Sequence, residues 1–256
     1  MTPGGGTMRF LLILLLLSLS APSFAAEPPL RVAVDAQYPP FGYREKAGNL
    51  AGFDVDIAVA LCSEMRRECL IKGMDFDDIL PAIIRGEIDI AVAGMGNTPE
   101  RARQINFTDR YYRSHSFFIK AEGTKMNISP EGLAGKSVGV QAGSAQEEYV
   151  KRTFPRAVLV PTPSFVDMMN DLKNGKVSLA ISEGLPAFAY LKTAEGAGLE
   201  TVGTPIQDSL LTGPSYIVVS KKLPQLVPTL NRALDAIRRS GEYARINRKY
   251  FDFNIY

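Results

Sequence analysis

Two stretches of the sequence repeat one pattern at a fixed distance. Residues 76–94 read FDDILPAIIRGEIDIAVAG, and residues 165–184 read FVDMMNDLKNGKVSLAISEG. Each has an amphipathic run, a glycine (Gly86 or Gly175) and then an apolar run, which predicts a helix, its end and a buried strand. The two stretches align without a gap at an offset of 89 residues. This doubled unit predicts two similar α/β lobes rather than one continuous sheet.

The rest of the chain fits the same plan. Ser144 and Glu147 form an S-x-x-E capping box, which predicts a helix start in the second lobe. The C-terminal part predicts a strand and two helices that return to the first lobe. The chain would then cross between the lobes twice, near residues 113–117 and 213–217, and these crossings would form a hinge. The expected lobes are residues 27–114 with 216–256, and residues 115–215.

The N-terminus differs in character from the remainder. Arg9 precedes an apolar run of ten residues, FLLILLLLSL, and small residues follow it. The run is shorter than the ~20 residues of a membrane-spanning helix, so it indicates a signal peptide, residues 1–25, with cleavage after Ala25 or Ala26. A buried helix is the alternative. We therefore expect a soluble protein exported to the periplasm.

Composition limits the classes of partner. The 256-residue chain is 46% hydrophobic and 22% charged, with a formal net charge of +2, which is typical of a soluble globular protein. It has no basic run, so we expect no nucleic-acid partner. His115 is the only histidine, so the chain has too few ligands for a histidine-rich metal site. His115 is most simply a surface or hinge residue. We expect no catalytic residues, no metal and no cofactor.

The two cysteines, Cys62 and Cys69, are seven residues apart. On one continuous helix their Cα atoms would lie about 10.5 Å apart, too far for a disulfide, which needs roughly 4.4–6.8 Å. Residues 52–65, GFDVDIAVALCSEM, predict an amphipathic helix. A bond therefore requires this helix to end near residues 66–68. An oxidising compartment favours that bond; two unlinked thiols, with Cys62 in the core, are the alternative.

A glycine-rich turn follows the first apolar strand, where residues 91–103 read AVAGMGNTPERAR. Thr98 suits a helix N-cap and Pro99 the first helical position, which places Arg101 in the first turn. A cation there is unfavourable unless an anion docks against it, and a guanidinium matches a carboxylate in two hydrogen bonds. The turn therefore indicates an anion site. A nucleotide loop, whose third glycine and lysine are absent here, and a plain tight turn are the alternatives.

Several segments together resemble a known family. In order they are RVAVDAQYPPFGY, LAGFDVDIAVALC, TPERARQINFTDRYY, GKSVGVQAGSAQEEY and KYFDFNIY. The chain resembles family 3 periplasmic solute-binding proteins of ABC importers over its whole mature length. Its ending and the spacing in CSEMRREC are most similar to the branch that binds lysine, arginine, ornithine and histidine. The resemblance implies a type II periplasmic-binding-protein fold that closes on one amino acid, a membrane permease as partner, and a Cys62–Cys69 disulfide. We expect a monomer.

The resemblance also implies site residues. Arg101 would clamp the ligand carboxylate, with the backbone N–H groups of Gly96 and Ala145 on either side of the cleft. Gln141 and Gln146 fall at cleft positions of the second lobe.

Four further residues would meet the rest of the ligand. Tyr38 and Phe76 would sandwich its side chain, Asp35 would meet a cationic end, and Glu183, where the branch usually has aspartate, would meet the α-ammonium group. Each has a plainer interpretation: Tyr38 and Phe76 as core residues, Asp35 as a strand-end cap, and Glu183 as a helix cap.

The chain departs from the branch at Ala93 and Gly94, within a turn that is usually serine-rich. Two hydroxyl groups are therefore missing, and Ala145 replaces a threonine. These smaller residues would leave more room, and the missing hydroxyl groups would otherwise face the ligand's amine. The ligand would then be bulkier than lysine, or Glu183 would be the main partner of its amine. A cationic amino acid remains the first expectation, because Asp35, Tyr38 and Phe76 are present. The alternatives to a binding protein are a periplasmic prephenate or arogenate dehydratase, with Glu183 as the acid, and a ligand sensor for a membrane receptor.

Overall fold

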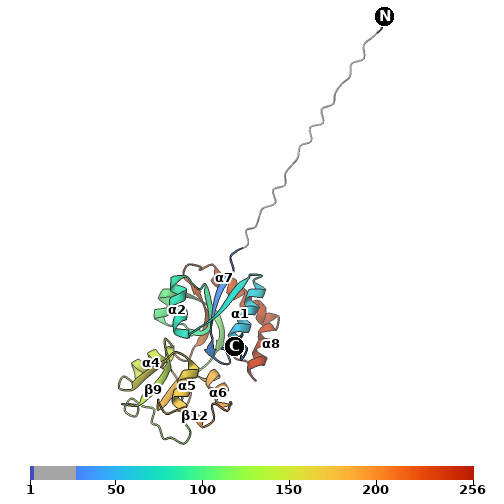
Figure 1. Cartoon of the computed structure of the whole chain (residues 1–256). Helices are drawn as coiled ribbons and strands as arrows, with labels where there is room; N and C mark the ends of the chain where they lie inside the picture. Colours follow the sequence, from blue (N-terminus) through green and yellow to red (C-terminus); the bar gives the residue numbers. More distant parts are fainter. Residues whose placement is uncertain (3–26) are drawn as a thin grey trace.

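A computed structural model of the chain describes residues 1–2 and 27–256. Apart from its first two residues, the predicted signal peptide lies outside the described part. Figure 1 shows two lobes, one above the other, with helices packed around each sheet. No helix of the described residues is long and apolar enough to span a membrane.

The first lobe is built on a five-stranded sheet. Its strands, in spatial order, are β5 (Cys69–Met74), β1 (Leu30–Asp35), β6 (Ile90–Gly96), β13 (Pro214–Ser220) and β7 (Ile105–Arg113). β1 is parallel to both β5 and β6, whereas β13 is antiparallel to its neighbours. Since β13 comes late in the sequence, the C-terminal part returns to this lobe, as predicted.

The second lobe carries a sheet of the same size. Its strands, in spatial order, are β10 (Val158–Thr162), β9 (Ser137–Gln141), β11 (Leu179–Glu183), β8 (Ser116–Ala121) and β12 (Leu199–Val202). The chain changes sheets between Arg113 and Ser116 and again between Val202 and Pro214. These two crossings agree with the predicted hinge; the exact lobe boundaries remain predictions.

The doubled unit adopts the same structure in both lobes. Helix α2 (Phe76–Arg85) is followed directly by Gly86, and helix α5 (Phe165–Lys173) by Asn174 and then Gly175; the two glycines have left-handed φ angles of 82° and 72°. Glycine is favoured there because a Cβ atom would be strained. β6 and β11 then start at positions that also differ by 89 residues.

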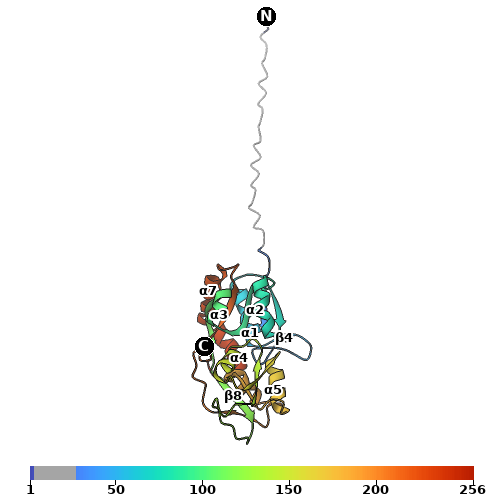
Figure 2. The same ribbon diagram turned by 90° about the vertical axis from the view of Figure 1, so that its left-hand side faces the viewer.

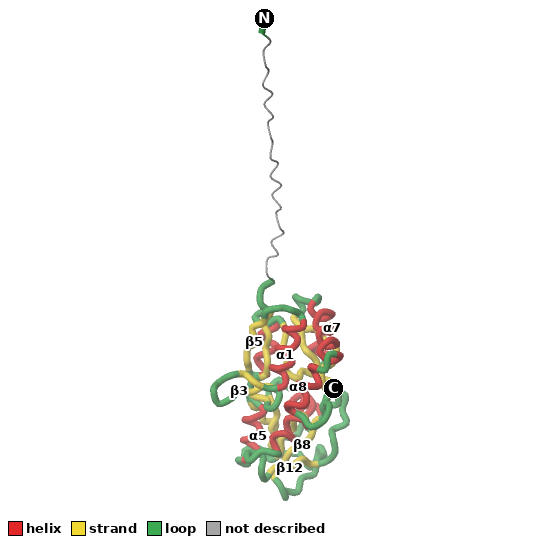
Figure 3. Tube along the Cα trace, turned by 90° about the vertical axis from the view of Figure 1, so that its right-hand side faces the viewer, coloured by secondary structure: helices red, strands yellow, loops and turns green. Residues whose placement is uncertain are grey.

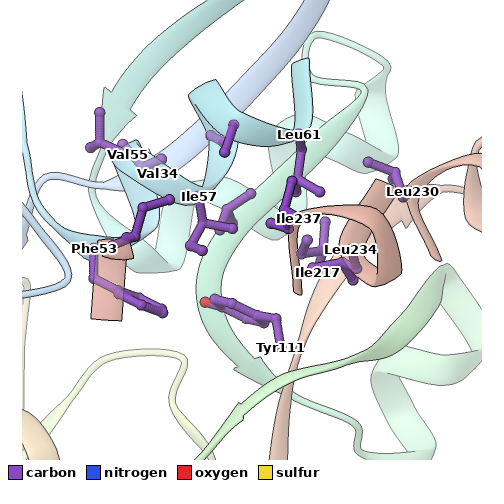
Figure 4. Close-up of a cluster of buried hydrophobic side chains, with 14 of the residues drawn as sticks. Val34, Phe53, Val55, Ile57, Leu61, Tyr111, Ile217, Leu230, Leu234 and Ile237 are labelled. Atoms are coloured by element: carbon purple, nitrogen blue, oxygen red, sulfur yellow. The ribbon is translucent and has the colours of Figure 1, made fainter. Parts of the chain in front are cut away.

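The core of the first lobe joins distant parts of the sequence. Helices α1 (Phe53–Glu64), α7 (Leu226–Arg239) and α8 (Glu242–Tyr250) pack on the same side of the lobe. Figure 4 shows Ile57 and Leu61 of α1 facing Leu234 and Ile237 of α7. Burying each such aliphatic side chain stabilises the fold by roughly 1.5–3 kcal/mol.

The remaining elements are short. They are the strands β2 (Gln37–Tyr38), β3 (Gly42–Arg44) and β4 (Leu50–Ala51) and the helices α3 (Pro99–Gln104), α4 (Ala145–Thr153) and α6 (Gly184–Leu191). Figures 2 and 3 show the loop between β3 and β4 projecting from the side of the molecule.

The disulfide between Cys62 and Cys69 is confirmed. Helix α1 ends at Glu64, and Arg66 has a φ angle of 51°, so the chain reverses between the cysteines. Their Cα atoms are 6.2 Å apart, within the range of a disulfide.

Candidate functional site

A cavity of about 230 Å³ lies between the two lobes. The structure brings every predicted site residue to its wall: Asp35, Tyr38, Phe76, Ala93, Gly94, Gly96, Arg101, Gln141, Ala145, Gln146 and Glu183. They come from the ends of strands and the starts of helices in both lobes. The wall is therefore one site, although the role of each residue toward a ligand stays a prediction.

Sequence reasoning missed part of the wall. Asn97, Ser144 and residues 209–216 also line the cavity. The last range belongs to the second crossing and the start of β13, which the sequence predicted as a hinge only. The Thr-Gly-Pro sequence in this range is typical of a loop, but no local signal shows that the loop faces the cleft.

Arg101 is held at the cavity by its own helix start. The side chain of Thr98 accepts a hydrogen bond from the Arg101 backbone N–H at 3.2 Å, so Thr98 caps α3 as predicted. The buried guanidinium donates to the carbonyl of Gly96 at 3.0 Å and, across the cleft, to that of Gly143 at 2.7 Å. A guanidinium carries five N–H donors, so these bonds leave donors for an anion.

Burial lowers the pKa of Arg101 to about 10, so the side chain stays charged at neutral pH. Its guanidinium carbon lies 5.7 Å from the centre of the Phe76 ring. Phe76 therefore supports the cation. Tyr38 packs edge-on against Phe165 of the second lobe, with ring centres 5.3 Å apart. Both aromatic residues line the cavity and also contact core residues, so the two interpretations of them are compatible.

Asp35 is buried at the end of β1 and forms bonds in two directions. Its Oδ1 accepts from the backbone N–H of Gln37 at 2.9 Å, which is the strand-end cap considered from the sequence. Its Oδ2 accepts from Gln141 Nε2 of the second lobe at 2.8 Å. Burial raises the pKa of this carboxyl to about 6.

Glu183 occupies the N-cap position of α6, but its side chain makes no capping hydrogen bond. Instead, Glu183 Oε2 accepts from the hydroxyl of Tyr112 in the first lobe at 3.0 Å. Burial raises the pKa of Glu183 to about 7. The plain interpretation of Glu183 as a side-chain cap is therefore wrong; the carboxylate bonds to the first lobe instead and lines the cavity.

The space beside Gly94 is not open, contrary to the expectation that the small residues leave more room. A Cβ atom on Gly94 would lie 2.5 Å from the hydroxyl oxygen of Tyr112. The tyrosine therefore fills the volume that a side chain at this position would need. The departure from the serine-rich turn does not by itself indicate a larger ligand.

A third buried acid lies behind the wall. Asp54, at the start of α1, accepts a hydrogen bond from the Tyr111 hydroxyl at 2.8 Å. That hydroxyl in turn accepts from the backbone N–H of Gly94 at 2.7 Å. Burial, together with the charges of Asp35 and Glu183, raises the pKa of Asp54 to about 8. Asp35 and Glu183 line the cavity, and their ionised forms favour a positive charge there. Within the described residues, no group of acidic, histidine or cysteine side chains is placed to hold a metal ion.

Two α/β lobes joined by two crossings, with a cavity lined by charged residues between them, define a two-lobed binding protein. Residues 30–253 match the bacterial extracellular solute-binding proteins, family 3, and the chain belongs to this family. The family is named for solute binding, which agrees with the prediction of a binding protein rather than an enzyme.

Individual relatives cover nearly the whole chain. The L-arginine-binding protein of Pseudomonas aeruginosa is 36% identical, over 93% of each chain. The lysine/arginine/ornithine-binding periplasmic protein of Escherichia coli K12 is 32% identical, over 94% of each chain. A solved structure of an ancestral arginine-binding protein bound to arginine superposes with a TM-score of 0.80 at 35% identity, covering 87% of this chain and 98% of that one. The family and fold expectations are thus confirmed.

Proposed function

We propose that the mature chain captures a cationic amino acid outside the cytoplasm and delivers it to an ABC permease. One observation carries the proposal: a single cavity presents the cation Arg101 and the two acids Asp35 and Glu183 from different elements. An amino acid with a positively charged side chain has the complementary groups, namely one carboxylate and two cations. Arginine, lysine, ornithine, histidine and bulkier derivatives have this chemistry.

The assignment of the groups follows their chemistry. The planar fork of Arg101 suits the ligand carboxylate. Glu183 suits the α-ammonium group, and Asp35 suits the cationic end of the side chain. The names of the relatives support this ligand class, since they include arginine-, lysine- and ornithine-binding proteins.

The setting of this activity is part of the proposal. We expect the mature chain to act as a monomer in the periplasm, because the sequence predicts a signal peptide and one relative is named as periplasmic. Closure of two lobes around a ligand changes the outer surface near the hinge. That change would let a permease distinguish the loaded protein from the empty one.

Calorimetry against a panel of amino acids tests the ligand class. We expect heat of binding with at least one of arginine, lysine, ornithine and histidine. Citrulline is the matched control for arginine, because it has nearly the same shape without the side-chain charge, and should bind at least about tenfold more weakly. Absence of binding by every amino acid would refute the proposal, and equal binding of citrulline and arginine would refute the cationic preference.

A further inference from the structure

The hydroxyl of Tyr112 links the two lobes behind the cavity. Tyr112 lies on β7 of the first lobe and is fully buried. Its hydroxyl is 3.0 Å from Oε2 of Glu183, at the end of β11 in the second lobe. Hydrogen bonds to a charged acceptor are stronger than neutral ones. This bond therefore fixes one carboxylate oxygen and leaves Oε1 for another partner.

The ring of Tyr112 cannot move aside easily. Its centre lies 4.8 Å from that of Phe41 and 4.8 Å from that of Tyr111, and Phe53 packs edge-on at 6.3 Å. All three neighbours are fully buried. The hydroxyl is consequently a donor with a fixed position, and Glu183 adjusts to it.

Gly94 makes room for this hydroxyl. Its φ angle of +63° is one that side chains rarely adopt, and an added Cβ would lie 2.5 Å from the Tyr112 oxygen but 3.7 Å from the ring carbon that bears it. A side chain at position 94 and the hydroxyl at position 112 therefore exclude each other. The residue that distinguishes this chain from the serine-rich turn is thus paired with a residue that the sequence did not single out.

We infer that Tyr112 is a positioning residue for ligand recognition: its hydroxyl, admitted by Gly94, holds Glu183 in the conformation that receives the ligand's α-ammonium group. This inference rests on the proposed function. It assigns the support of the ammonium position to a tyrosine behind the wall, which bonds to Glu183 rather than to the ligand. It also explains how the site keeps a defined ammonium position although Ala93 and Gly94 carry no hydroxyl.

Tyr112→Phe tests the inference because it removes only the hydroxyl. We expect its affinity for arginine to fall about tenfold. Its affinity for 5-guanidinopentanoate, which is arginine without the α-amino group, should stay within about twofold. If Tyr112 had a merely structural role, its replacement would lower the affinity for both ligands alike, and that result would overturn the inference. Unchanged binding of arginine would overturn it too.

Tyr250→Phe is the matched control. It also removes a tyrosine hydroxyl that bonds to a carboxylate, Asp56 Oδ2 at 2.8 Å, but it lies away from the cavity. Its affinity for arginine should stay within twofold. If the wild-type protein binds no amino acid, the proposed function itself fails. If the wild-type protein and Tyr112→Phe bind arginine equally well, only the inference about Tyr112 fails.

The steric part of the inference has a test that needs no ligand. Gly94→Ala should lower the melting temperature of the wild-type protein more than that of Tyr112→Phe, because only the hydroxyl is too close to the new Cβ. The strain from the φ angle is common to both backgrounds and cancels in the double-mutant cycle. Equal losses in the two backgrounds would overturn the claim that Gly94 makes room for Tyr112.

Discussion

Gln141 of the second lobe donates a 2.8 Å hydrogen bond from Nε2 to Oδ2 of Asp35 in the first lobe. Arg101 reaches Gly143 and Tyr112 reaches Glu183 across the same cleft. Each of the three bonds involves a charged residue that we assign to the ligand. The groups that a ligand would contact therefore also form the hydrogen bonds between the lobes. Because the same groups take part in both, lobe closure and ligand binding are coupled.

Affinity for a cationic amino acid should rise with pH. Without ligand, burial raises the pKa of Glu183 to about 7 and that of Asp35 to about 6. A bound cation favours the ionised carboxylates and lowers both values, so binding releases protons below pH 7. We expect the affinity for arginine to increase at least about tenfold from pH 5 to pH 7. Calorimetry in buffers of different ionisation enthalpy measures the protons released.

Glu183→Gln is the control for this pH dependence. It removes the group with the higher pKa, so the increase between pH 6 and pH 7 should become shallower, while the increase set by Asp35 at lower pH remains. Proton uptake on binding by the wild-type protein, or an affinity independent of pH, would contradict the assignment of these carboxylates to the ligand.

Asp54→Asn should stabilise the protein, and more so at higher pH. The folded-state pKa of Asp54 is about 8, above its unfolded value near 4, because burial disfavours the charge. The folded state therefore binds more protons, and this group's contribution to stability is lost as the pH rises from about 4 to 8. Asparagine still accepts from Tyr111. We expect a gain of roughly 2–5 kcal/mol in the free energy of unfolding at pH 8, measured by urea denaturation.

Asp56→Asn provides the comparison for Asp54. Asp56 lies on the same helix but forms an ion pair with Lys249 at 2.8 Å. Its replacement should not raise stability at pH 8. If Asp54→Asn shows no gain that grows with pH, the buried carboxylate is not a source of instability.

Much of the fold followed from local signals. Gly86 and Gly175 end helices where the sequence predicted, and Thr98 and Ser144 cap the helices that follow them. Such signals work because the backbone groups at a helix end must find partners nearby, whatever the rest of the fold does. The order of strands and helices, together with the doubled unit, then favoured two α/β lobes.

The residues behind the cavity wall could not be predicted from the sequence. Tyr112 lies on β7 beside Tyr111, and its ring is fully buried in the core. Its link to Glu183 spans 71 residues and depends on how the lobes close. Gly94 signalled a smaller side chain, but only the tertiary structure shows what occupies the space.

Loss of the disulfide should cost stability without changing ligand recognition. The bond closes a short loop between α1 and β5, for which chain entropy predicts about 2–3 kcal/mol. Neither cysteine lines the cavity. The double variant Cys62→Ala, Cys69→Ala should unfold at lower urea concentration, and its affinity for arginine should stay within twofold. A loss of affinity in the folded variant would show that this end of the lobe is coupled to the site.

Arg101→Lys should weaken arginine binding at least tenfold, although it keeps the charge. A lysine offers one compact ammonium group, whereas the guanidinium donates to Gly96 and Gly143 and still has donors for a carboxylate. Agmatine, which is arginine without its carboxylate, makes the test specific. It should bind more weakly than arginine, and its affinity should be nearly the same for the wild-type protein and for Arg101→Lys. Arg103→Lys, an exposed change on the same helix, should leave both ligands within twofold. If Arg101→Lys bound arginine as well as the wild type does, or lost agmatine and arginine equally, Arg101 would be a structural residue rather than the carboxylate clamp.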